Sequence, residues 1–137
     1  MCVPLKVPPP AWANHAGARG SRGAGYTYER KVEQRLAALA ADLGWELWAH
    51  QWFQCGGQLA QPDFILRSPS CALVIETKLT YVETRTQLTK YVNWLALMSI
   101  PAVPLTICRN LTPEVPQDIL VYDLDSIFPY SVLHWWM

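Results

Sequence analysis

Two short apolar segments separated by a three-residue turn constrain the fold of this chain more than any other feature. The segments "PDFILR" and "CALVIETK" have the length and side chains of buried strands, and "SPS" between them is rich in turn-forming residues. We expect an antiparallel hairpin. Asp63 opens its first strand, and Glu76 and Lys78 close the second. Because only 16% of the residues are charged, three charges at the ends of such apolar strands require an explanation.

The other segments predict an α/β fold with a mixed central sheet flanked by helices. Apolar residues at helical spacing, followed by Gly44, predict a first helix over Tyr26–Leu43. "WELWAHQWFQ" predicts a strand, "CGGQLAQ" a loop, "TRTQLTKYVNWLALMS" a second helix, and "VPLTICR" and "DILVYDL" two further strands. Short connections favour antiparallel pairing of the first strands, and the strand–helix–strand crossover favours a parallel neighbour.

A length of 137 residues fits one domain. We expect residues 1–25, rich in Pro and Gly, to form an extended flexible arm that carries Arg19 and Arg22, and residues 26–137 to form the domain. The apolar tail "DSIFPYSVLHWWM" is expected to dock on the core or on a second subunit, so a homodimer is one option. No apolar run is long enough to span a membrane, and no signal peptide is recognised, which predicts an intracellular, cytoplasmic protein.

Net charge and cysteine spacing narrow the function classes. The formal net charge is zero, so contact with DNA or RNA would be local, or a metal would neutralise the phosphates. The four cysteines have no zinc-ligand or iron–sulfur spacing, and we expect free thiols rather than disulfides. His50, inside a predicted strand, is expected to be a hydrogen-bonded histidine of the core or sheet edge rather than a general base.

Side-chain alternation places Glu76 and Lys78 on one face of their strand. The open end of the hairpin would then bring Asp63 beside them. One interpretation is an ordinary salt bridge at a sheet edge. The other is a functional site: two adjacent carboxylates have raised pKa values unless a cation lies between them, and Mg²⁺ prefers such oxygen ligands.

The two helices contribute further candidates. At about 100° per residue, Glu29 lies about 50° from the apolar stripe of the first helix and leans toward the sheet, whereas Glu33, about 90° away, faces solvent. Glu29 is either a third ligand or a partner of the helix dipole. In the second helix, Gln87 and Tyr91 share one ridge. They are either boundary and core residues or polar groups at the mouth of the carboxylate cluster.

Taken together, these residues resemble the PD-(D/E)XK nuclease superfamily. Pro62-Asp63, Glu76-Thr77-Lys78 and the preceding helix glutamate match its signature, and the element order is similar to its αβββαβ, restriction-endonuclease-like core. Gly25-x-x-x-Glu29-Arg30 is similar to the opening of archaeal Holliday-junction resolvases. "QLTKY" is similar to the Q-x-x-x-Y motif of the RecB-like and CRISPR-associated exonuclease branches.

The resemblance implies hydrolysis of DNA phosphodiester bonds with Mg²⁺ or Mn²⁺. It implies that Asp63, Glu76, Glu29 and the carbonyl of Thr77 bind the metal and that Lys78 orients the nucleophile or stabilises developing charge. Gln87 and Tyr91 would position the DNA strand or hold Lys78. Arg19 and Arg22 would contact flanking phosphates, although the arm that carries them is equally interpreted as a simple leader.

Three hypotheses follow from the sequence. The first is the metal-dependent deoxyribonuclease. The second is a catalytically inactive relative that binds nucleic acid or serves in assembly. The third is a small interaction protein that docks through its Trp-rich tail. Divalent-metal binding that depends on Asp63 separates the first two from the third, and a cleavage assay separates the first from the second.

Overall fold

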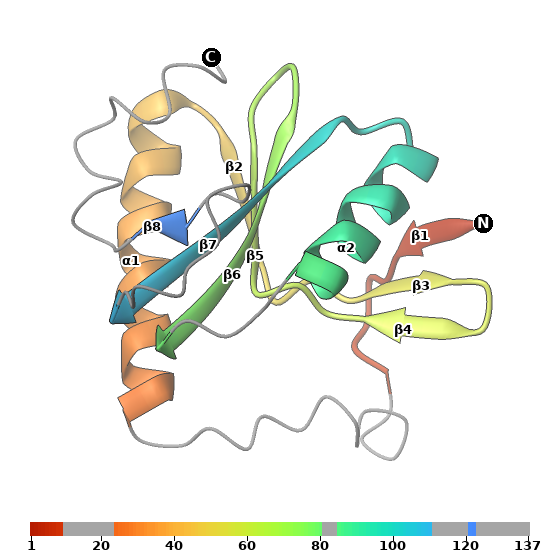
Figure 1. Cartoon of the computed structure of the whole chain (residues 1–137). Coiled ribbons are helices and arrows are strands. Elements are labelled where there is room, and N and C mark those ends of the chain that lie inside the picture. Colours follow the sequence, from red (N-terminus) through yellow and green to blue (C-terminus); the bar gives the residue numbers. More distant parts are fainter. Residues whose placement is uncertain (10–23, 81–84, 111–120, 123–137) are drawn as a thin grey trace.

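The computed structural model describes residues 1–9, 24–80, 85–110 and 121–122. This part of the chain is mixed α/β, with two helices, α1 (Ala24–Leu43) and α2 (Arg85–Leu97), and two β-sheets (Figure 1). The larger sheet contains β2 (Glu46–Ala49), β5 (Phe64–Arg67), β6 (Ala72–Thr80), β7 (Ala102–Asn110) and β8 (Val121–Tyr122). The smaller sheet contains β1 (Cys2–Pro4), β3 (Phe53–Cys55) and β4 (Gln58–Ala60).

The larger sheet has the strand order β2-β5-β6-β7-β8 and is mixed. β5 pairs antiparallel with both β2 and β6, whereas β7 pairs parallel with β6 and with β8. The parallel β6–β7 pair is joined through α2, as a strand–helix–strand crossover requires. The predicted hairpin of β5 and β6 and the predicted parallel neighbour are therefore confirmed.

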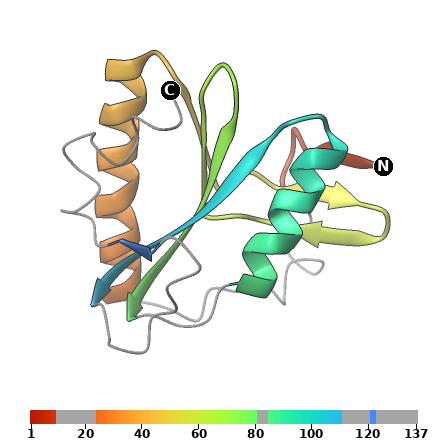
Figure 2. The ribbon, with the colours of Figure 1, turned by 45° about the horizontal axis from the view of Figure 1, so that its top comes forward.

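The helices cover opposite faces of the larger sheet, and each closes a separate apolar core (Figures 1 and 2). On the α1 face, the helix residues Val32, Leu36 and Leu39 pack against alternate residues of β5, β6 and β7. On the α2 face, Leu88, Tyr91 and Leu95 pack against the other set of alternate residues. Burial on both faces explains why the sequences of β5 and β6 are almost continuously apolar.

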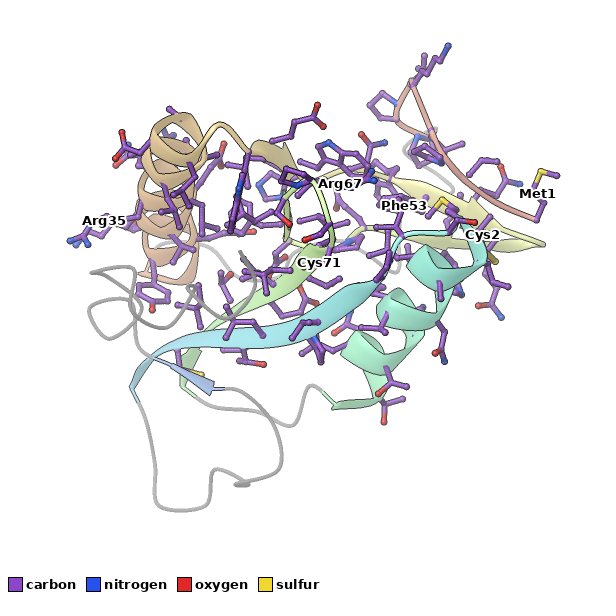
Figure 3. All side chains as sticks on the ribbon, turned by 90° about the horizontal axis from the view of Figure 1, so that it is seen from above. Met1, Cys2, Arg35, Phe53, Arg67 and Cys71 are labelled. Atoms are coloured by element: carbon purple, nitrogen blue, oxygen red, sulfur yellow. A yellow bond between two sulfur atoms is a disulfide. The ribbon has the colours of Figure 1, made fainter. Side chains whose placement is uncertain are left out.

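The small sheet lies on the α2 side of the molecule. Phe53 and Ala60, from β3 and β4, belong to the core that α2 closes. Seen from above, Cys2 and Phe53 lie beside α2, while Arg35 points away from α1 on the other side of the molecule (Figure 3). The small sheet thus extends the core beyond the edge of the larger one.

The segment Trp45–Gln54 differs from the single strand that we predict from sequence. It forms β2 and β3, which belong to different sheets, and the chain turns between them at His50, whose φ is 56°. The following predicted loop is also wrong, since β3 and β4 form an antiparallel hairpin around Gly56 and Gly57. Gly56 has a φ of 61°, which glycine adopts without steric cost.

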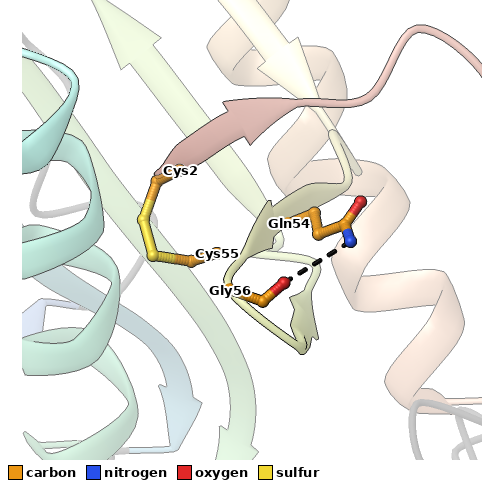
Figure 4. The surroundings of a disulfide bond; sticks show 4 residues. All are labelled: Cys2, Gln54, Cys55 and Gly56. Carbon is orange, nitrogen blue, oxygen red and sulfur yellow. Dashed lines mark hydrogen bonds between the residues drawn. A yellow bond between two sulfur atoms is a disulfide. The ribbon is translucent and has the colours of Figure 1, made fainter.

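The N-terminal segment carries a strand and a disulfide that the sequence did not indicate. β1 pairs antiparallel with β3, and Cys2 is bonded to Cys55 across this pair (Figure 4). The prediction of free thiols is therefore wrong for Cys2 and Cys55, and it is confirmed for Cys71 and Cys108. At least the first residues of the predicted arm are attached to the domain.

Several predicted features lie outside the described residues. Arg19 and Arg22 are among them, as is the apolar tail "DSIFPYSVLHWWM" that suggested a homodimer. The role of the arm in DNA contact and the dimer therefore stay predictions.

Candidate active site

The candidate site lies where three neighbouring strands of the larger sheet separate. The last paired positions are Ala49 with Phe64 and Phe64 with Ile75. The next residues are His50, which follows β2, Asp63, which precedes β5, and Glu76, which lies in β6. β6 continues beyond this point beside β7, whereas the chain after β2 leads to β3, and the chain before β5 comes from β4, both in the small sheet. A gap in backbone pairing therefore opens beside Asp63 and Glu76.

Asp63 and Glu76 face each other across this gap, as the alternation predicted. The backbone N–H of Asp63 donates to Glu76 Oε2 at 3.0 Å. Asp63 Oδ2 accepts two hydrogen bonds from Thr77, one from its backbone N–H at 2.9 Å and one from its hydroxyl at 3.1 Å. The two carboxyl groups are thus fixed by the backbone of each other's strand, and both residues are buried.

The environment of Glu76 disfavours a negative charge. Burial raises the pKa of its carboxyl to about 9, and the Asp63 charge and a hydrogen bond to the Asp63 side chain act in the same direction. The backbone hydrogen bond from Asp63 and the positive charge of Lys78 oppose this rise without cancelling it. At neutral pH Glu76 therefore holds a proton unless another positive charge enters the site.

Lys78 follows Glu76 on the same face of β6 and is half-buried. It is paired with Cys108 of β7 in the strand register. Burial raises the pKa of the Cys108 thiol to about 11, and the Lys78 charge partly opposes the rise. Lys78 thus influences both Glu76 and Cys108, and its ammonium is the positive charge next to the acidic pair.

The two glutamates of α1 lie as the helix-face argument predicted. Glu29 is buried, whereas the Glu33 side chain is 42% exposed. Glu29 Oε1 lies 3.7 Å from His50 Nδ1, and Glu33 Oε1 lies 3.6 Å from His50 Nε2. Both carboxylates line a cavity of about 480 Å³ at this end of α1, together with Arg30, Gln34, Ala37, His50 and Gln61.

Within the described residues, no group of three or more His, Cys, Asp or Glu side chains is arranged to hold a metal ion. Asp63 and Glu76 form a pair, and Glu29 Oε1 lies near His50 Nδ1. The structure therefore brings together Asp63, Glu76, Thr77 and Lys78, and it places Glu29 on α1 next to His50.

Gln87 and Tyr91 interact with each other on α2. Gln87 Nε2 donates to the Tyr91 hydroxyl at 2.7 Å, as expected for positions i and i+4. The Tyr91 ring is buried in the core between α2 and the sheet, and Gln87 is exposed. Their packing therefore matches the interpretation of Gln87 as a boundary residue and Tyr91 as a core residue. Their proposed contact with DNA remains a prediction.

His50 is the residue at this site that sequence reasoning did not select. It looked like the middle of one strand because the residues on both sides are aromatic and apolar. The signal available was the polar pair His50–Gln51, which interrupts that pattern where the chain leaves the larger sheet. The structure places its backbone against Asp63 and its imidazole between the two glutamates of α1.

Comparison with protein-family models and with curated proteins finds no match for this chain. Among the described residues, neither helix is long and apolar enough to cross a membrane.

Proposed function

We propose that this protein is a divalent-metal-dependent nuclease that hydrolyses DNA phosphodiester bonds, with a PD-(D/E)XK type of active site. The observation that supports this best is the buried pair of Asp63 and Glu76, held in contact at a gap in the sheet with Lys78 beside it. Such a pair is costly for folding alone, because two carboxyl groups are removed from water next to each other.

The order of elements supports the same proposal. Leaving out β1 and the β3–β4 hairpin, the chain runs α1, β2, β5, β6, α2, β7, which has the form αβββαβ. Asp63 precedes the second of these three strands, and Glu76 and Lys78 lie in the third. This order and these positions support the proposed resemblance to the superfamily.

The donor set fits Mg²⁺ or Mn²⁺. Asp63 and Glu76 offer carboxylate oxygens, the ligands that these cations prefer. The N–H of Thr77 points at Asp63, and because the N–H and C=O of a strand residue point to the same neighbour, the Thr77 carbonyl faces the same gap. Glu29, on the adjoining side, is the fourth proposed ligand. When bound, such a cation supplies Lewis acidity that lowers the pKa of water and offsets phosphate charge.

The residues of the chain have distinct roles in this proposal. Asp63 stays fixed through its two bonds to Thr77, and Glu76 releases its proton when the cation is present. The Lys78 ammonium holds the attacking water or the phosphate oxygen on which charge develops. Gln87, Tyr91, Arg19 and Arg22 are proposed to position the DNA strand, and α2 lies on the same face as Lys78.

Cleavage assays test this function. Linear, single-stranded, flap and four-way DNA are incubated with Mg²⁺ or Mn²⁺ and the wild-type protein, Glu76→Ala or Lys78→Ala. We expect metal-dependent cleavage by the wild type, none by Glu76→Ala, and a loss of roughly 10²–10³-fold for Lys78→Ala with Mn²⁺ binding retained.

Lys31→Ala is the matched control, because Lys31 is exposed on α1. Wild-type rates for Lys78→Ala would remove this residue from the mechanism. A wild-type protein that binds Mn²⁺ through Asp63 and cleaves none of these substrates would instead support the inactive, nucleic-acid-binding module.

A further inference from the structure

His50 connects the acidic pair to the helix that carries Glu29. We propose that His50 is a positioning residue that holds Glu29 in place for the cation site, an inference that rests on the proposed nuclease function. Its backbone contacts Asp63, and its side chain contacts Glu29. The residue thus joins two proposed ligands that come from different elements of the fold.

The backbone of His50 is held in an uncommon conformation. Its φ of 56° lies in the left-handed region, which is sparsely populated by residues other than glycine. The His50 N–H donates to the Asp63 carbonyl at 3.0 Å, and the His50 carbonyl accepts from Gln61 Nε2 at 3.1 Å. Such conformations persist only where the surroundings fix them, and they concentrate at functional sites.

This conformation directs the imidazole toward α1. The ring lies against Phe64, with ring centroids 5.2 Å apart and planes inclined at 57°. Its two nitrogens then face different carboxylates, Nδ1 toward Glu29 at 3.7 Å and Nε2 toward Glu33 at 3.6 Å. One aromatic ring therefore sits between the two acidic side chains of α1 and keeps them apart.

Removing the ring would leave Glu29 without this lateral support. The cavity of about 480 Å³ borders both residues, so the Glu29 carboxylate has room to shift toward it when the imidazole is absent. Residues that orient metal ligands typically contribute 10–100-fold to metal affinity or activity. We expect a loss of this size when the imidazole is removed.

His50→Gly tests the role of the ring without adding backbone strain, since glycine adopts a positive φ freely. We expect the melting temperature to stay the same or rise, while Mn²⁺ affinity by calorimetry and the DNA cleavage rate each fall about 10–100-fold. Free imidazole in the millimolar range should enter the cavity and restore part of both. Ser99→Gly is the matched control, because Ser99 also has a positive φ, of 64°, and lies after α2; it should keep wild-type affinity and rate.

The outcomes distinguish this inference from the proposed function. If the wild type binds Mn²⁺ and His50→Gly binds it equally well, the positioning role is wrong and the nuclease proposal stands. If the wild type neither binds Mn²⁺ nor cleaves DNA, both are wrong. The contact is also read directly from the imidazole ¹⁵N shifts of His50, which should move in Glu29→Gln; shifts equal to those of the wild type would overturn the inference. Loss in His50→Gly without any imidazole rescue would also count against it.

Discussion

Among single residues, Glu76 has an environment far from that of a surface carboxylate. It is buried, it contacts a second acid, and its pKa is raised to about 9. Either a proton or a cation has to compensate this arrangement. Burying this carboxyl costs desolvation free energy that a hydrophobic residue at the same position would not cost. Such unfavourable burial of an ionisable group is typical of binding and catalytic sites.

The raised pKa of Glu76 predicts how the stability of the metal-free protein depends on pH. The native state binds the proton more tightly than the unfolded chain, whose pKa is near 4.5. This contribution to the free energy of unfolding is therefore complete below pH 4.5 and is lost as the pH rises toward about 9. One proton gives a slope of at most about 1.4 kcal/mol per pH unit. Urea unfolding over this range should show the decline.

Glu76→Gln is the informative variant for this dependence. Glutamine resembles the protonated carboxyl and can still accept from the Asp63 N–H, so the decline with pH should be smaller than in the wild type. Glu33→Gln, at a half-exposed position, should keep the wild-type profile. Parallel profiles for Glu76→Gln and the wild type would show that Glu76 does not hold the proton.

The sequence predicted part of this site and missed part of it. The meeting of Asp63 with Glu76 follows from alternation and from the hairpin, both of which are local in the chain. The position of Glu29 followed from helical periodicity. The role of His50 depends on a backbone turn and on contacts with α1, and neither leaves a periodic signal in one sequence.

At the scale of elements, the end of α1 shows that a local sequence signal, Gly44, was sufficient to predict where a helix ends. Gly44 follows the last helical residue with a φ of 69°, and the Trp45 N–H donates to the Ala40 carbonyl at 2.9 Å. This is the hydrogen bond of a Schellman cap. The predicted stop at Gly44 is therefore confirmed with its physical reason.

Gly44→Ala should lower the free energy of unfolding by about 1–2 kcal/mol, because an L-residue is strained in the left-handed region. A Cβ at Gly44 would meet nothing within 4 Å, so the effect is conformational rather than steric. Gly57→Ala is the control, since Gly57 has equal space and no positive φ. Equal changes in chemical denaturation for both variants would contradict this assignment.

The break between β2 and β3 could not be predicted from local sequence signals, because it depends on which strands each half of the segment pairs with. Aromatic and apolar residues on both sides of His50–Gln51 in "WELWAHQWFQ" suit a strand, and only tertiary pairing assigns the first half to β5 and the second half to β1 and β4. The Cys2–Cys55 bond was missed for a related reason, because partners 53 residues apart leave no spacing signature.

The disulfide predicts a redox-dependent stability. Closing a loop with a sequence separation of 53 stabilises the folded state by up to about 4 kcal/mol in the chain-entropy description. Dithiothreitol should therefore lower the melting temperature of the wild type and have little effect on Cys55→Ser. An equal effect on both would show that the bond does not form. Such bonds are rare in reducing compartments, so redox state bears directly on the predicted cytoplasmic location.

At the scale of the whole molecule, the larger sheet separates two cores, and the candidate site lies at the boundary of both. Glu76 and Lys78 lie on the α2 face of β6 with Val74, whereas Thr77 lies on the α1 face with Ile75. The mixed α/β class was predictable from the order of apolar segments. The second sheet was not, because its strands are short and β1 is distant in sequence from β3, with which it pairs.

Because the site joins strands and helices from both cores, an ion bound there stabilises the native state as a whole. A ligand that binds only the folded protein adds about 2.7 kcal/mol at one hundred times its dissociation constant. We expect Mn²⁺ to raise the melting temperature of the wild type accordingly and to leave that of Asp63→Asn unchanged. Asp42→Asn, at an exposed position on α1, is the control and should keep the full shift.

This measurement requires neither a DNA substrate nor catalysis, so it separates cation binding from nuclease activity. A shift that persists in Asp63→Asn would place the ion elsewhere on the protein, and the buried acids would then need a different explanation. A shift that disappears in Asp63→Asn and grows with pH in the wild type would show that the ion displaces a proton. The pKa of the Glu76 carboxyl is raised into that range, so such a pH dependence would support Glu76 as the group that exchanges its proton for the ion.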